Sequence, residues 1–182
     1  MKLLRRHSLF YIQRGEAIPA IEPRGDVTFQ QVTRENVDDV LSFRPPSIKD
    51  IFCRQLDKGQ LGIYAYRDGQ AVAHGWMIVN RDPCKMRANG YFVLRSREAL
   101  VHFCSVDEEH RGLGIYQSQL CELYRRAFAG EPVDTIYIDT VIDNLASRKA
   151  IEKTATFLTN AYYLNFFSRA FRLPCLGAWV NR

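Results

Sequence analysis

The spacing of apolar residues changes several times along the chain, and each change predicts a new element. In the first part, a short alternating run (27–32) precedes two groups of apolar residues at helical spacing, around 37–41 and 48–56, with Pro45-Pro46 between them. Ser47 stands directly before the second group and is predicted to cap it. One strand and two helices are therefore expected here.

Beyond Gly59 the spacing becomes that of β-strands. Two apolar runs, 61–66 and 70–79, flank Asp68-Gly69, and such a pair between strands is a strong β-hairpin signal. Residues 98–106 (EALVHFCSV) are predicted to form a buried strand, and residues 115–128 a helix with one apolar face.

The remainder of the chain continues this alternation of strands and helices. Residues 135–141 are rich in β-formers, 144–155 are predicted to form an amphipathic helix, and 157–180 two further strands. Antiparallel strands followed by β-α-β-α-β indicate a mixed α+β fold. Residues 1–26, with two prolines, are predicted to be an N-terminal extension that lies on the domain or is partly loose, and 27–182 a single domain.

Composition narrows the class of protein without indicating a function. The chain has 182 residues, of which 47% are hydrophobic, and 25 basic against 20 acidic residues give a net charge of +5. These values fit one globular domain and exclude a collagen, a coiled-coil rod or a disordered tail. The apolar runs fall far short of the roughly 20 residues of a membrane-spanning helix. Because the first residues also lack the pattern of a signal peptide, we expect a cytoplasmic protein.

The metal-binding residue types and the basic residues are scattered. With no C-x-x-C pair, neither a zinc ribbon nor a thioredoxin-type motif is supported, and no metal site is predicted. Lys and Arg form no block of five or more, so no nucleic-acid partner is expected, although the positive excess suits an anionic cofactor. The five cysteines are Cys53, Cys84, Cys104, Cys121 and Cys175.

The most informative stretch is residues 101–128 (VHFCSVDEEHRGLGIYQSQLCELYRRAF). A buried strand ends, a short acidic loop follows, and Gly112 and Gly114 open a helix. The first N–H groups of such a helix are unpaired and lie at the positive end of its dipole, and glycines let a phosphate approach the main chain. The stretch therefore predicts a phosphate or pyrophosphate seat, to which Arg111 adds charge.

Three families of phosphate-binding loop share this physics, and spacing distinguishes them. A Walker A loop needs Lys and Ser/Thr after its last Gly, and a Rossmann loop needs Gly or Ala where this chain has Gln117. The run 109–114 instead resembles the [Q/R]-x-x-G-x-[G/A] cradle of the GNAT superfamily of N-acetyltransferases. Residues 135–140 are similar to the fifth strand of that family, and 144–153 to its N-x-x-S-x-x-x-x-E-K motif.

The resemblance implies a fold and a cofactor site. The GNAT-type fold has a mixed, mostly antiparallel sheet of six or seven strands, flanked by helices and splayed between the fourth and fifth strands. The resemblance also implies acetyl-CoA as co-substrate, without a metal. The pantetheine arm and thioester would lie along Cys104, Ser105 and Val106, with Asn144 and Ser147 near the arm. The pyrophosphate would be held by the main chain of Arg111, Gly112, Leu113, Gly114, Ile115 and Tyr116.

The implied reaction is direct attack of an amine on the thioester in a ternary complex, which needs a base because alkyl amines are largely protonated at neutral pH. Glu98 and His102 share one face of the fourth strand by two-residue alternation and are the candidates, although neither falls cleanly on the site of the family's catalytic Glu. Asp139 on the fifth strand is a third candidate. A structural role is the alternative for each of the three.

The chain departs from the family pattern at the position of the acid. Many members carry a Tyr seven residues after the Asn of the second motif, and Ile151 stands there in this chain. Tyr162 and Tyr163 are the candidates to protonate the departing thiolate, with half-buried strand positions as the alternative. A second departure is Tyr116, which stands where the family has a small residue.

These inferences together predict an N-acetyltransferase that acts on the primary amine of a small molecule, amino sugars included. Two alternatives remain open: a CoA-binding regulatory or interaction module without turnover, and a transferase of longer acyl chains. Acetylation of proteins also remains open, because acceptor specificity lies in the variable loops, about 44–60 and 80–97, which carry no motif. Pairing through the C-terminal strands, which is common in the family, leads us to expect a homodimer.

Overall fold

The computed structural model describes residues 4–88, 92–166 and 169–172 of the chain. Its large sheet contains β1 (Leu4–Gln13), β2 (Val27–Gln31), β3 (Leu61–Arg67), β4 (Gln70–Val79), β7 (Glu98–Val106), β8 (Thr135–Val141), β9 (Thr156–Phe166) and β10 (Arg169–Arg172). A separate pair consists of β5 (Met86–Ala88) and β6 (Phe92–Leu94). The helices are α1 (Ser47–Asp57), α2 (Ile115–Gly130) and α3 (Leu145–Ile151), with the 3-10 helices η1 (Val37–Ser42) and η2 (Glu108–His110).

The large sheet has the strand order β10-β9-β1-β8-β7-β4-β3-β2. Its neighbouring strands run antiparallel, except for the parallel pair β7 and β8. The predicted α+β fold with a mixed, mostly antiparallel sheet is therefore confirmed. The described sheet contains eight strands rather than six or seven because β1 was not expected to belong to it.

The prediction of an N-terminal extension is wrong for β1, which is an internal strand. It pairs with β8 along one edge and with β9 along the other. Leu9 packs into the cluster on one face of the sheet, while Phe10 and Ile12 pack into the cluster on the other. A strand buried on both faces lacks the alternation of apolar and polar residues that marks a half-buried one, so the pattern did not reveal it.

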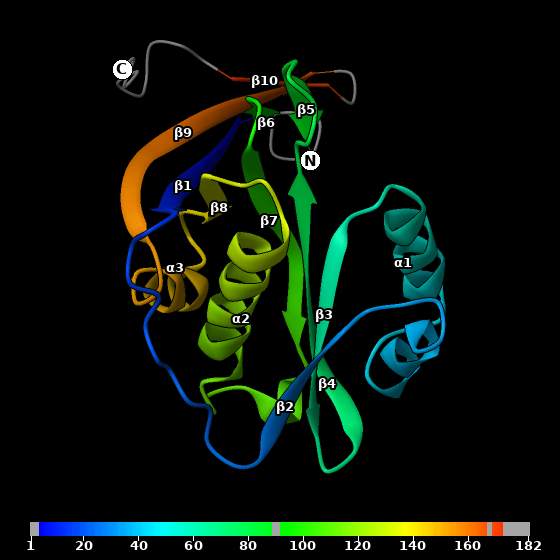
Figure 1. Cartoon of the computed structure of the whole chain (residues 1–182). Helices are drawn as coiled ribbons and strands as arrows, with labels where there is room; N and C mark the ends of the chain where they lie inside the picture. The colour runs from blue at the N-terminus through cyan, green and yellow to red at the C-terminus, as the bar shows by residue number, and fades with distance from the viewer. Residues whose placement is uncertain (1–3, 89–91, 167–168, 173–182) are drawn as a thin grey trace.

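Helices cover both faces of the sheet (Figure 1). On the α2 face, side chains of α2 and α3 pack with Phe10, Val101 and Ile138. On the α1 face, α1 and η1 pack against Tyr64 and Trp76 of β3 and β4. Because β4 and β7 lie near the middle of the sheet, residues of β7 reach both helical layers.

Three helix predictions need correction. Pro46 occupies the N-cap of α1 and Ser47 is its first residue, with no side-chain cap among the described residues. The N–H of Ile48 instead donates to the carbonyl of Pro45 at 3.0 Å, so the proline turn itself satisfies the start of the helix. The predicted helix around 37–41 is the 3-10 helix η1. The helix predicted over 144–155 is shorter and begins after Asn144, whose Oδ1 accepts from Ser147 N at 3.1 Å.

Candidate functional site

Strands β7 and β8 separate part of the way along their length. Their parallel pairing runs from Glu98 opposite Thr135 to Val101 opposite Ile138 and is described no further. Both strands continue past this point, β7 to Val106 and β8 to Val141. The split lies between the two strands for which it was predicted. It leaves the main chain of β7 after Val101 without a strand partner on the β8 side.

A β-bulge deforms β7 directly beyond the split. Trp76 of β4 is opposite His102 and His74 is opposite Ser105, so Phe103 and Cys104 together face Gly75. Phe103 has a φ of +48°, a left-handed conformation that is strained for a residue with a Cβ. Ring packing fixes it there, with the Phe103 centroid 5.2 Å from that of His74. The bulge sends the Phe103 side chain to the α1 face and that of Cys104 to the α2 face.

The glycine loop after β7 forms a cradle that is open beside Gly112, whereas Gly114 lies against the main chain of Glu22 and Pro23. Gly112 and Gly114 have φ values of +80° and +82°. A Cβ added to Gly112 would find no described atom within 4 Å, so the space beside it is empty. Gly114 is the N-cap of α2, and no described side chain caps this helix. Ser118 N donates to Gly114 O at 3.1 Å, so the N–H groups of 115–117 precede the first bond of the helix and suit an anion.

The predicted CoA-binding residues lie around one region. Cys104, Ser105 and Val106 follow the split on β7, and the cradle (residues 111–116) comes directly after η2. Asn144 and Ser147 lie at the start of α3, which follows β8. The hydroxyl groups of Tyr116 and Ser147 are 3.4 Å apart, so α2 and α3 meet at this point. The structure thus gathers the residues of both sequence motifs around the split.

Tyr116 is enclosed between α2 and α3. Its side chain packs against the hydrophobic cluster of the α2 face. Burial raises the pKa of the Tyr116 hydroxyl far above its usual range, and the neighbouring Cys104 and Asp139 add to this effect, so the hydroxyl keeps its proton. Burial likewise raises the pKa of Cys104 to about 12, so its sulfur is a neutral thiol rather than a nucleophile.

The two predicted base candidates lie in different places. Glu98 is at the start of β7, where β8 is still paired, and it accepts hydrogen bonds from Arg95 N at 2.7 Å and Tyr137 Oη at 3.2 Å. The structure therefore does not bring Glu98 to the split. His102 is the first residue beyond Val101, and its Nε2 lies 2.9 Å from Gln60 Oε1. Burial is the main cause that lowers the pKa of His102, to about 4, so the ring is neutral at pH 7.

The predicted acid candidates do not lie at the split. Tyr162 is on β9, opposite Arg6, and β1 separates β9 from β8. The side chain of Tyr163 lies outside the described residues. Ile151, at the family's tyrosine position, is fully buried in the hydrophobic cluster of the α2 face.

A His–Asp pair lies near the split and was only half anticipated. His7 Nδ1 on β1 hydrogen-bonds to Asp139 Oδ2 on β8, with side chains 9% and 7% exposed. Asp139 is also close enough to His102 to raise its pKa. Asp139 was a candidate base from the sequence, whereas His7 was missed because its segment was taken for an extension. Recognition of β1 as a buried strand would have been the signal.

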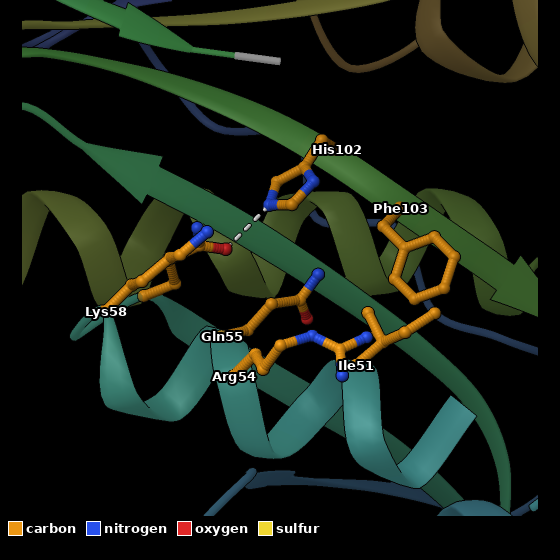
Figure 2. A pocket seen from close by; sticks show the side chains of 7 residues that line it. Ile51, Arg54, Gln55, Lys58, His102 and Phe103 are labelled. Atoms are coloured by element: carbon orange, nitrogen blue, oxygen red, sulfur yellow. Dashed lines mark hydrogen bonds between the residues drawn. The ribbon is translucent and has the colours of Figure 1, made fainter. Parts of the chain in front are cut away.

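A pocket of about 520 Å³ lies between α1 and β7, beside the bulge (Figure 2). Residues 51, 54, 55 and 58 recur at helical spacing, which places them on one side of α1. From the sequence, only the apolar residues of this helix were used, so the polar residues that line the pocket were not predicted. The lining residues are Ile51, Arg54, Gln55, Lys58, Gln60, His102 and Phe103.

Comparison with known families supports this arrangement. The profile of the Acetyltransferase (GNAT) family matches residues 29–157. The chain belongs to the GNAT acetyltransferase family. The match includes the split strands, the bulge and the cradle, and it confirms the resemblance inferred from residues 109–114 and 144–153. A sequence search among curated proteins finds no significant match.

Solved structures of GNAT proteins share the fold at low sequence identity. A GNAT acetyltransferase from Colwellia psychrerythraea is 16% identical with a TM-score of 0.61, over 86% of this chain and 54% of that one. AAC(6')-Iy in complex with the bisubstrate analogue CoA-S-monomethyl-acetylneamine is 14% identical with a TM-score of 0.53, over 70% and 88%. A GCN5-related glucosamine N-acetyltransferase region of a fungal multi-domain β-N-acetylglucosaminidase is 11% identical with a TM-score of 0.61, over 85% and 20%. The chain therefore spans about half of the Colwellia protein and a fifth of the fungal one.

Two features are absent from the residues that the structure describes. No helix within residues 4–88, 92–166 and 169–172 is long and apolar enough to cross a membrane. In the same ranges, no group of three or more His, Cys, Asp or Glu side chains is arranged to hold a metal ion.

Proposed function

We propose that this protein is an N-acetyltransferase that transfers the acetyl group of acetyl-CoA to the primary amine of a small molecule. The observation that carries the proposal is the continuity of three features: the split of β7 from β8, the bulge at Phe103-Cys104 and the open cradle at 111–116. Together they offer a path of main-chain groups from an anion seat to a strained turn of β7. Membership of the GNAT family supports the same activity.

The residues fit CoA by their chemistry. The empty space at Gly112 and the uncapped start of α2 suit the pyrophosphate, because N–H groups at a helix N-terminus attract anions. The open edge of β7 over 104–106 suits the amides of the pantetheine arm, which can pair with it as another strand would. When bound, acetyl-CoA supplies the activated acyl group.

The chain's own groups then stabilise the developing charge, accept a proton and hold the reactants in place. Main-chain N–H groups at the bulge donate to the carbonyl oxygen of the thioester, where negative charge grows during attack. The amine nitrogen forms a bond to the acyl carbon, the bond from carbon to sulfur breaks, and one proton passes from nitrogen to a base. The sulfur leaves as thiolate and takes up a proton from water. Most of the rate enhancement comes from holding the reactants in place.

We propose His102 rather than Glu98 as the residue that accepts the proton. His102 lies beyond the split and lines the pocket, whereas Glu98 is bonded to Arg95 and Tyr137 away from it. Because Gln60 Oε1 can only accept, Nε2 of His102 carries the ring proton and Nδ1 keeps its lone pair. The lowered pKa keeps this lone pair free at neutral pH.

A CoA-binding module without turnover is the second candidate, and one observation favours it. Ile151 has no hydroxyl, and Tyr162 is separated from β8 by β1, so neither can protonate the thiolate in the arrangement described. The protein would then bind acetyl-CoA and release no CoA thiol.

Calorimetric titration and thiol release distinguish the two candidates. Acetyl-CoA is titrated into the protein, with ATP as a control for general anion binding and a long-chain acyl-CoA as a control for acyl length. CoA release is then followed over amines, amino sugars and peptides. Binding with release on a small amine supports the transferase, whereas binding without release on any acceptor supports the module. Failure of acetyl-CoA to bind at millimolar concentration would contradict both.

A further inference from the structure

The pocket between α1 and β7 is positively charged. Its two ionic lining side chains among the described residues are Arg54 and Lys58, and no carboxylate lines it. A third cation, Arg44, lies at the bulge, where its Nη1 donates to Ser105 Oγ at 3.3 Å. His102 adds no charge of its own because its ring is neutral at pH 7. The space beside the open part of β7 is therefore bounded by unneutralised cations.

Basic residues elsewhere around α1 have carboxylate partners. Lys49 of the same helix pairs with Asp38, and Arg34 pairs with Asp57. Within the part of the chain that the structure describes, neither Arg54 nor Lys58 forms an ion pair. Both side chains are exposed, so each is available to an anion that enters the pocket. The contrast indicates that the unpaired cations gather on the side of α1 that faces the pocket.

Gln55 provides a second, independent sign of a ligand. Its residue is only 8% exposed, and its Oε1 is buried with no hydrogen-bond partner among the described residues. Figure 2 shows Gln55 reaching from α1 toward the strands between Arg54 and His102. A buried carbonyl oxygen without a donor is unfavourable, so a turn of the Gln55 amide toward the pocket that it lines would let this oxygen accept from an N–H group of a bound molecule.

We propose that the acceptor is a small primary amine that also carries an anionic group, a carboxylate or a phosphate. This inference rests on the proposed transferase function and names the substrate class for it. The anionic group lies between Arg54 and Lys58, and the amine extends toward Gln55, His102 and the bulge. The pocket volume of about 520 Å³ fits a molecule of metabolite size.

The same charges assist the chemistry. Cations close to the amine disfavour its protonated form, and only the neutral amine is a nucleophile. An amine without an anionic group meets this repulsion with nothing to offset it. An anionic amine gains attraction from Arg54 and Lys58 and is held with its nitrogen toward β7. The pocket therefore selects for the pair of groups rather than for an amine alone.

The test uses acceptors in pairs, in which one member carries the anionic group and the other lacks it. An amino acid is compared with its carboxamide, and glucosamine 6-phosphate with glucosamine; the two pairs distinguish a carboxylate from a phosphate. Initial rates of CoA release give KM and kcat for each acceptor on the full chain. We expect the anionic member of at least one pair to have a KM about tenfold lower, and this preference to weaken with added salt.

The variant is Arg54→Gln with Lys58→Gln, and the matched control is Arg34→Gln with Lys49→Gln, which removes the same two charges from cations that have carboxylate partners. The double variant is expected to raise KM for the anionic acceptor about tenfold and to remove its advantage over the neutral acceptor, which no longer meets the repulsion of the two cations. The control is expected to change neither. Equal KM values within both pairs, or a double variant that behaves like the control, would overturn the inference.

Direct binding separates this inference from the proposed function. Each acceptor is titrated calorimetrically into the protein with CoA absent, so the result does not depend on turnover. Tighter binding of an anionic member, lost in the double variant, supports the acceptor class even if acetyl-CoA fails to bind. If acetyl-CoA binds and no anionic member binds more tightly than its neutral match, the acceptor class is wrong while the CoA site stands.

Discussion

The two faces of the split strand β7 are built in different ways. On the α2 face, the cradle is built of main-chain groups around Gly112 and Gly114, and almost no side chain takes part. On the α1 face, the pocket is built of side chains from α1 and β7. A site made of backbone needs only the right dihedral angles and serves one ligand across a family, whereas a site made of side chains can change with every substitution. The family resemblance is therefore informative about the cradle on the α2 face and says almost nothing about the pocket on the α1 face.

The largest expected effect comes from Phe52, which supports only the α1 face. It is fully buried, with ring centroids 4.9 Å from Trp76 and 6.0 Å from Phe103. Phe52→Ala should lower the free energy of unfolding by about 3–5 kcal/mol in urea denaturation, because it leaves a cavity. In protein that stays folded, the acceptor KM should rise while the affinity for acetyl-CoA stays the same. A parallel loss of both affinities would show that the two faces are not independent.

A lower pH should destabilise the folded protein through His102, which lies on the α1 face. Its pKa of about 4 in the folded protein lies below the usual 6.5 of a histidine, so the unfolded chain binds the extra proton first as the pH falls. His102 leaves the free energy of unfolding at its full value above pH 6.5. Between about pH 6.5 and 4 the free energy of unfolding falls by an amount on the order of 3 kcal/mol. His102→Gln should flatten this part of the stability profile and lower kcat, with acetyl-CoA affinity unchanged.

The control for His102 is a second buried histidine. Burial lowers the pKa of His74 to about 3, and its centroid lies 4.8 Å from that of Phe52, inside the α1 layer. His74→Gln should also reduce the dependence of stability on pH. It should leave the pH profile of kcat unchanged, since His74 does not line the pocket. An identical kcat profile for wild type and His102→Gln would exclude His102 as the base.

Gly112→Leu should affect only the α2 face. A side chain at φ +80° is strained and fills the empty space beside the cradle, so the Kd for acetyl-CoA should rise about a hundredfold by calorimetry. Gly15→Leu is the matched control, because Gly15 also has a positive φ, +93°, and open space beside it. It should carry a similar backbone cost without loss of CoA affinity. Equal affinity in the two variants would mean that the pyrophosphate binds elsewhere.

The smallest effect is expected at the contact between α2 and α3. Tyr116→Phe removes one long hydroxyl contact with Ser147. We expect the midpoint of thermal unfolding to fall by an amount that corresponds to about 1 kcal/mol or less, with the acceptor KM unchanged. A strong loss of kcat would instead show that the Tyr116 hydroxyl takes part in the reaction.

The elements with strict spacing could be predicted from the sequence. The bounds of β7 match the prediction, and the hairpin with Asp68-Gly69 and the start of α2 at Ile115 follow it closely. Each depends on residues near one another in the chain: a turn dipeptide, a run of β-formers, two glycines before an apolar helix face. Local physics alone fixes such features.

The remainder of the site depends on contacts between distant segments. Glu98 and His102 are equivalent by alternation, and only the pairing of β7 with β8 shows that one precedes the split and the other follows it. Tyr162 is remote only because β1 is inserted beside β9. The partners of Lys49 and Arg34, and the lack of one for Arg54 among the described residues, likewise emerge only in the fold. No spacing rule encodes such relations.

The place of β1 has a consequence for the order in which the molecule can assemble. Strand β1 pairs with β8 and β9, which begin more than 100 residues later in the chain. The hairpin of β3 and β4 joins neighbouring segments and can form early during synthesis, whereas β1 must wait until β8 and β9 have been synthesised. Until then Leu9, Phe10 and Ile12 stay exposed, and a nascent chain stalled before β8 would offer a chaperone a ready apolar segment.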